Sequence, residues 1–209
     1  MGGHFMAPKP WEIQPDFVLT RLQLLENVLR EARHRALALH DPVEGDNNWS
    51  LGCRIYARSC SALVNAAVQW DWLSILDEGQ QFIFKIGNVP VRFFHGDSES
   101  LSASRLEVAP EEALQLEMCY GDSAIDLIWR LVVETNSAGE VLRIVLIGAH
   151  TEGGIDVHFP IPREDKLTAF APPRTPTRRG VVMPPPSVTV LTPKRASDTN
   201  SNDDSEPKV

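Results

Sequence analysis

The stretch QFIFKIGNVPVRFFH, residues 81–95, decides the fold class of this chain. Its apolar residues follow an alternating period of two, and Gly87-Asn88 between the two halves suits a tight two-residue turn. We therefore expect a β-hairpin. If Ile86 lies opposite Val89, one face of the hairpin carries Phe82, Phe84, Ile86, Val89, Val91 and Phe93. Pro90 has no backbone N–H to donate, so the second strand is expected at a sheet edge, or with its pairing broken at that residue.

Further strand patterns lie downstream of this hairpin. A second hairpin is expected over residues 126–148, with Glu134 and Arg143 near enough diagonally to pair across it. A last strand is expected at residues 155–161, where apolar and polar residues alternate. Between the hairpins, residues 110–118 predict a short helix, because a proline and two glutamates occupy its first turn.

Two helices are expected upstream. Residues 15–40 form one long helical pattern, with an apolar stripe at Val18, Leu22, Leu25, Leu29, Ala32, Ala36 and Leu39. A second helix is expected over residues 53–68 or a little beyond, and its apolar run continues to a glycine stop at Gly79. We expect Trp49 to pin down the connecting loop, residues 41–52. The two helices should pack as an antiparallel hairpin.

The composition changes near Phe170. Residues 171–209 hold eight of the 16 prolines and no Trp, Tyr or Phe, so burial cannot offset the entropy lost on ordering them. We expect a flexible N-terminus at residues 1–14, a single α+β domain at residues 15–170 and a disordered proline-rich tail at residues 171–209. The domain should be an N-terminal helical hairpin packed on an antiparallel sheet of about five strands.

The charge balance narrows the class of protein. The 209 residues carry 20 basic and 28 acidic side chains, a formal net charge of -8, and residues 1–170 alone carry -10. A protein that coats a nucleic acid needs a basic face, so this balance argues against that function. No apolar run approaches the length of a membrane span. Three scattered cysteines without a CxxC pair fit reduced thiols, and we expect a cytoplasmic protein.

The sequence offers one candidate catalytic pair. It lacks the motifs GxxxxGK[ST], GxGxxG, GxSxG and HExxH. His95 and Asp97 leave the first hairpin and open a serine-rich loop, with potential nucleophiles at Ser98, Ser100, Ser102 and Ser104. The alternative, which we prefer, is a solvated serine-rich connection.

A second polar cluster has the residue types of a metal site. His150, Glu152, Asp156 and His158 could ligate a divalent metal if the glycine turn at residues 153–154 folds them together. The alternative is a turn whose polar residues face water. We prefer that interpretation and expect no cofactor.

The second hairpin also carries two arginines, Arg130 and Arg143, beside Glu134. Arginine forks of this kind can bind a phosphate or a carboxylate. We prefer a solvent-facing ladder of cross-strand charge pairs.

The tail contains a small apolar island, residues 181–191, with basic pairs on both sides at Arg178-Arg179 and Lys194-Arg195. A proline run is already extended and loses less entropy on docking, and a short aliphatic segment can add to a partner's sheet edge. The alternative is an ordinary linker. The residues expected to contact a partner are Val181, Val182, Met183, Val188, Val190 and Leu191.

Together these patterns predict a non-enzymatic protein-interaction module: an inhibitor, an antitoxin-like protein or an accessory subunit of a bacterial-type complex. We expect its partner to be another protein, bound through residues 181–191, and neither a membrane nor a nucleic acid. A homo-oligomer stays open, because the stripe on the first helix could pair between copies. The alternative function is a hydrolase that uses a His/Asp/Glu cluster, with or without a metal. A hydrolase should gather these histidines and carboxylates around one cleft, whereas a binding protein should leave them dispersed.

Overall fold

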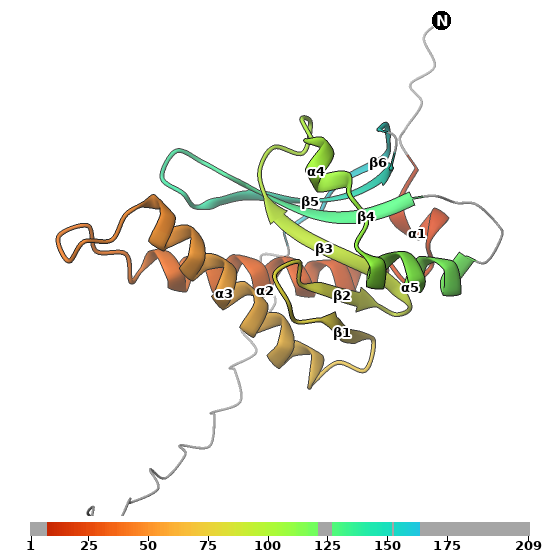
Figure 1. The fold of residues 1–209 in the computed structure, drawn as a ribbon, viewed down its shortest axis with the longest axis horizontal. Helices are drawn as coiled ribbons and strands as arrows, with labels where there is room; N and C mark the ends of the chain where they lie inside the picture. The colour runs from red at the N-terminus through yellow and green to blue at the C-terminus, as the bar shows by residue number, and fades with distance from the viewer. Residues whose placement is uncertain (1–7, 121–126, 152, 164–209) are drawn as a thin grey trace, which may run out of the picture. The chain divides into compact units, whose positions relative to one another are not determined.

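A computed structural model of the chain describes residues 8–120, 127–151 and 153–163 (Figure 1). The chain divides into two units, residues 1–166 and 167–209, and all described residues belong to the first. The predicted tail therefore lies outside the described residues, as does part of the predicted N-terminal segment, and both stay predictions.

The described strands form one six-stranded sheet in chain order, β1-β2-β3-β4-β5-β6. Their bounds are β1 Leu73–Asp77, β2 Ile83–Ile86, β3 Val89–His95, β4 Leu127–Thr135, β5 Val141–His150 and β6 Ile155–Pro160. The predicted register of the first hairpin is confirmed, since Ile86 pairs with Val89 across the turn. Glu134 and Arg143 lie directly opposite one another on β4 and β5, not on a diagonal as predicted.

The α+β class is confirmed, but the sheet is mixed and not purely antiparallel. β3 and β4 run parallel, with Val91 beside Trp129. Parallel neighbours need a crossover connection, and α4 (Ala103–Leu106) and α5 (Pro110–Tyr120) occupy it. β3 is consequently an inner strand. Pro90 lies opposite Lys85 of β2, and the parallel ladder with β4 begins one residue later, at Val91, so pairing is interrupted at the proline on the β4 side alone and the proline does not mark an edge.

The sixth strand, β1, is where the prediction of a continuing helix was wrong. Residues 73–77 pair with β2, with Leu73 opposite Ile86 and a bulge between Ile75 and Asp77. A short apolar run with no clear alternation does not distinguish a helix end from a strand. Here the tertiary pairing decides in favour of the strand.

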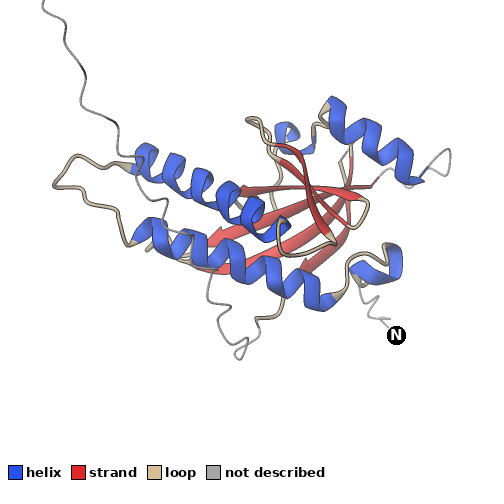
Figure 2. Ribbon diagram, turned by 90° about the horizontal axis from the view of Figure 1, so that it is seen from below, coloured by secondary structure: helices blue, strands red, loops and turns tan. Residues whose placement is uncertain are grey.

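Two long helices cover one face of the sheet (Figures 1 and 2). They are α2 (Leu19–Leu37) and α3 (Asn48–Ala67), preceded by the short α1 (Pro10–Ile13). The middle of the predicted stripe on α2 is buried against Trp129 and neighbouring strand residues, whereas its ends, Val18 and Leu39, are exposed. The predicted packing of the stripe within one chain is confirmed.

The opposite face of the sheet is also covered. Phe94, Ile128, Val132 and other strand residues pack there against side chains of the β3–β4 crossover: Leu101, Leu106, Val108 and Leu116. The domain therefore has three layers, with α2 and α3 on one side of the sheet and α4 and α5 on the other (Figure 2).

Candidate functional site

The predicted catalytic pair does not meet as a pair. His95 Nε2 lies 2.8 Å from Thr135 Oγ1, at the ends of two neighbouring strands. Asp97 instead accepts a hydrogen bond of 2.9 Å from the backbone N–H of Glu99. Burial, together with the positive charges of Arg33 and Arg105, lowers the pKa of His95. These contacts fix a strand end and a turn.

Ser98, one of the serines considered as a nucleophile, lies between an acid and a histidine. Its buried hydroxyl donates a short hydrogen bond to Glu134 Oε1, and its Oγ lies 2.8 Å from His158 Nε2. Glu134 also accepts 2.5 Å and 3.2 Å hydrogen bonds from Arg143. The cluster joins the loop after β3 to strands β4, β5 and β6.

The directions of the hydrogen bonds in this cluster argue against nucleophilic catalysis by Ser98. Burial alone would raise the pKa of Glu134, but hydrogen bonds from Arg143 and Ser98 hold it below its ordinary value, so the carboxylate is ionised and only accepts. The Ser98 hydroxyl must then give its proton to Glu134, and His158 Nε2–H donates to the serine oxygen. A serine nucleophile needs the reverse, a histidine that takes the serine proton. The geometry is that of a structural clamp.

The predicted metal ligands divide between two places. His150 Nε2 lies 3.0 Å from Asp156 Oδ2 in an exposed pair, whereas His158 is engaged with Ser98. Glu152 lies outside the described residues. Among the residues that the structure describes, no three His, Cys, Asp or Glu side chains come together as a group that could hold a metal ion.

The prediction that Arg130 belongs to a solvent-facing ladder of charge pairs was wrong. Its side chain is fully buried, and its Nη1 makes a short hydrogen bond to Glu112 of α5, which is also fully buried. Further hydrogen bonds of 2.9 Å and 3.1 Å reach the carbonyls of Arg105 and Glu107. The pair fastens the crossover helices to the sheet. Arg143 and Glu134 do form the expected cross-strand pair.

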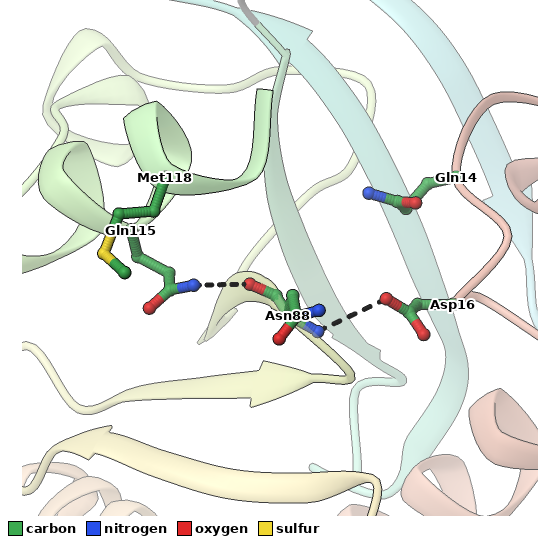
Figure 3. Close-up of a pocket in the computed structure, with 5 residues that line it drawn as sticks. All are labelled: Gln14, Asp16, Asn88, Gln115 and Met118. Carbon is green, nitrogen blue, oxygen red and sulfur yellow. Dashed lines mark hydrogen bonds between the residues drawn. The ribbon is translucent and has the colours of Figure 1, made fainter. Parts of the chain in front are cut away.

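A cavity of about 350 Å³ lies where α5, the β2–β3 turn and the α1–α2 connection meet (Figure 3). Its lining is polar apart from one thioether: Gln14, Asp16, Asn88, Gln115 and Met118. Asp16 accepts a 3.3 Å hydrogen bond from the Asn88 N–H, and the Gln115 amide donates a 3.0 Å bond to the Asn88 carbonyl. These side chains hold the turn between two layers, which gives the cavity a structural role.

A projecting element carries Val43, the most exposed large apolar side chain of the described residues, together with Trp49, while other exposed apolar side chains such as Val68 and Met118 lie elsewhere. We call residues 37–58, the end of α2, the connecting loop and the first half of α3, the arm. The structure describes every residue of the arm, and none of them is buried. Val43 is 92%, Trp49 77% and Leu39 55% exposed. Both ribbon views place the α2–α3 loop beyond the ends of the strands (Figures 1 and 2).

Polar contacts centred on Asp46 give the arm a defined shape. Arg54 donates hydrogen bonds of 2.9 Å and 2.8 Å to the two Asp46 oxygens and a third, of 2.9 Å, to the Leu39 carbonyl. These bonds from Arg54, with a further one from the Asp41 N–H, hold the pKa of Asp46 well below its ordinary value. Asn47 caps α3 by accepting from the N–H groups of Trp49 and Ser50. The exposed apolar residues therefore stand on an ordered loop.

The prediction that Trp49 packs down the connecting loop was wrong. Its side chain faces solvent at the start of α3. The base of the arm is fixed to the sheet by Arg33, which donates a 2.5 Å hydrogen bond to the Gly139 carbonyl in the β4–β5 turn. Sequence reasoning missed the arm as a candidate site. The available signal was the length of the two helices compared with the strands that they cover.

The predicted partner-binding residues, Val181, Val182, Met183, Val188, Val190 and Leu191, lie outside the described residues and stay a prediction. None of the helices in the described segments combines the length and the apolar character needed to cross a membrane. No protein-family model, curated protein or solved structure matches this chain.

Proposed function

We propose that this chain is a cytoplasmic, non-enzymatic protein-interaction module that docks a partner protein on the arm. One observation carries the proposal: Val43 and Trp49 are 92% and 77% exposed on a loop whose backbone is held by the Asp46–Arg54 contacts. Exposed apolar patches mark protein interaction sites more than single exposed residues do, and this loop and the helix start beside it carry two such large side chains. Tryptophan is also among the residues most enriched at binding hot spots.

The arm has a fixed conformation before a partner binds, and this favours affinity. Binding costs free energy when a loop and its side chains must first be ordered, and a preorganised surface avoids part of that cost. The Asn47 cap and the Asp46 contacts fix the backbone on both sides of Trp49 before a partner arrives. The arm is therefore suited to reversible docking without local folding.

The apolar island of the tail, residues 181–191, is a second proposed contact with the partner. A segment of this kind gains affinity from a few anchors. Replacing Val188, Val190 and Leu191 with serine should weaken association and leave the thermal melt of the domain unchanged. An inhibitor, an antitoxin-like protein or an accessory subunit would each use such a pair of contacts.

The hydrolase alternative has less support. It needs the candidate histidines and carboxylates to converge around one cleft. The structure instead places His95 against Thr135 and His150 against Asp156. His158 contacts Ser98. The dispersal of these residues favours a binding function.

The test is recovery of a partner by affinity purification of the full chain from its native host, compared with Trp49→Ser. The matched control is Val68→Ser, which changes another exposed apolar residue, at the opposite end of α3. We expect Trp49→Ser to lose the partner and the control to retain it, with equal melting temperatures. Equal recovery by both variants would refute docking on the arm.

A further inference from the structure

The charges on the arm are not balanced. Asp46 is paired with Arg54, which leaves Asp41 and Glu44 on either side of Val43 as carboxylates without an ion pair in the described structure. Both are exposed, and Asp41 uses one oxygen to accept the Val43 N–H. The other basic side chains of the arm are His40, whose Nδ1 lies 3.7 Å from Asp46 Oδ2, and Arg58, which lies farther along α3. The tip thus combines apolar anchors with uncompensated negative charge.

From this combination we infer that the arm docks a basic segment of another protein, one that carries a few large aliphatic side chains between arginines or lysines. The inference rests on the proposed function and names the chemistry of its partner. Apolar side chains would cover Trp49 and Val43, and the flanking cations would face Asp41 and Glu44. Complementary charge at the rim of an apolar contact guides encounter and excludes wrong partners.

A second copy of this chain fits the arm less well. Residues 1–170 carry a net charge of -10, so two copies repel at distance. Two arm tips brought together would also place the unpaired carboxylates of both copies side by side, and like charges in contact oppose association. Charge complementarity therefore selects a basic partner.

The edges of the sheet offer less access to a partner's strand. β1 carries a bulge before Asp77, and β6 carries the exposed Asp156 and ends at Pro160, which has no N–H to donate. Bulges, charges and prolines at edges are features that block strand addition. The arm is the better route to association.

The size of the tip sets the expected strength. A contact formed by one loop and the first turns of a helix buries about 1,200 Å² or less in total, the range of weak and transient complexes. We therefore expect a dissociation constant in the micromolar range, reached mainly through Trp49.

The probe is a fluorescein-labelled synthetic peptide, RRSLLSLLSRR, titrated against the full chain by fluorescence anisotropy. Its matched controls are EESLLSLLSEE, which reverses the charge, and RRSSSSSSSRR, which removes the anchors. We expect the first peptide to bind more tightly than either control by about ten-fold or more, and its affinity to fall with added salt.

Two variants separate the apolar and the electrostatic contributions by kinetics. Glu44→Lys should slow association by about three-fold or more with little change in dissociation, because a rim charge acts on encounter. Trp49→Ser should speed dissociation by about ten-fold, because the loss of a buried anchor shortens the lifetime of a complex. Val68→Ser should change neither rate. A merely structural role for the arm would not divide the two rates in this way.

Four outcomes would overturn the inference: no binding of the basic peptide, equal binding of the acidic peptide, a Trp49-dependent dimer in sedimentation of the full chain, or tighter probe binding after Val188, Val190 and Leu191 are changed to serine. The last two would identify a second copy or the chain's own tail as the occupant. If the native partner needs Trp49 but the basic peptide does not bind, the proposed function stands and the assignment of a basic segment fails. If the native partner ignores Trp49, the proposed function itself fails.

Discussion

The buried pair of Arg130 and Glu112 provides the sharpest test of how the crossover helices are held on the sheet. Both side chains are fully buried, and the guanidinium also donates hydrogen bonds to the carbonyls of Arg105 and Glu107. Arg130→Met keeps a long side chain in the space but removes the charge and all of these donors. The carboxylate of Glu112 would remain in the interior without its main partner.

Breaking one side of a buried ion pair costs about 3–5 kcal/mol, because the remaining charge is left uncompensated. Arg92, whose Nη1 lies 3.7 Å from Glu112 Oε2, can compensate a part, so we expect the lower half of that range. For a domain of this size, each kcal/mol lowers the melting temperature by about 2–4 °C. The variant should therefore melt about 10 °C below the parent chain.

The assay is urea unfolding followed by circular dichroism, with Glu112→Leu combined with Arg130→Met as the comparison. The double variant should be more stable than Arg130→Met alone, because it buries no unpaired charge. It should stay below the parent, since the Arg105 and Glu107 carbonyls lose their donor. A single variant within about 1 kcal/mol of the parent would refute the reasoning.

Three further predictions test the core, the β2–β3 turn and the arm. Leu25→Asp should cost on the order of 3 kcal/mol or more in urea unfolding, because Leu25 is fully buried against the sheet; a monomer that melts like the parent would contradict this. Gly87→Ala should cost on the order of 2 kcal/mol in the same assay, because φ is +61° and a Cβ would lie 2.2 Å from the Asp16 carboxylate; an unchanged melt would show that Asp16 moves aside freely. The pKa of Asp46 is depressed by Arg54, so its stabilising contribution is complete above the ordinary Asp pKa of about 4 and is lost as the pH falls through the folded value. Hydrogen-exchange protection of residues 41–50 should accordingly begin to fall below about pH 4 and fall further toward about pH 2, while that of α2 persists; equal protection at about pH 5 and about pH 2 would be inconsistent with the Asp46 contacts.

The fold was predictable from sequence where local chemistry decides it. The turn at Gly87-Asn88 and the alternation on either side fix the register of one hairpin, and the stripe around Leu25 fixes the buried face of α2. The parallel pairing of β3 with β4 was not predictable in the same way. It depends on how the crossover packs, and that packing includes a buried pair, Arg130 with Glu112, whose members lie on different elements 18 positions apart.

The candidate chemistry shows the same limit. Spacing alone placed His95 beside Asp97 and placed His158 with His150, but strands and turns point these side chains toward different neighbours. Adjacency in sequence does not supply the geometry on which a catalytic or metal site depends.

The arm results from a mismatch of lengths that is already present in the sequence patterns. A helix of 20 residues such as α3 spans about 30 Å at 1.5 Å per residue. The strands β1 and β2, with 5 and 4 residues, span only about 13–17 Å at 3.3 Å per residue. The excess lies in the first turns of α3, before Tyr56 stacks on Phe93 of β3, and the buried residues of α3 begin only at Ser59. Trp49 lies in that excess, so its large apolar side chain, which composition alone would assign to a core, is left exposed to solvent.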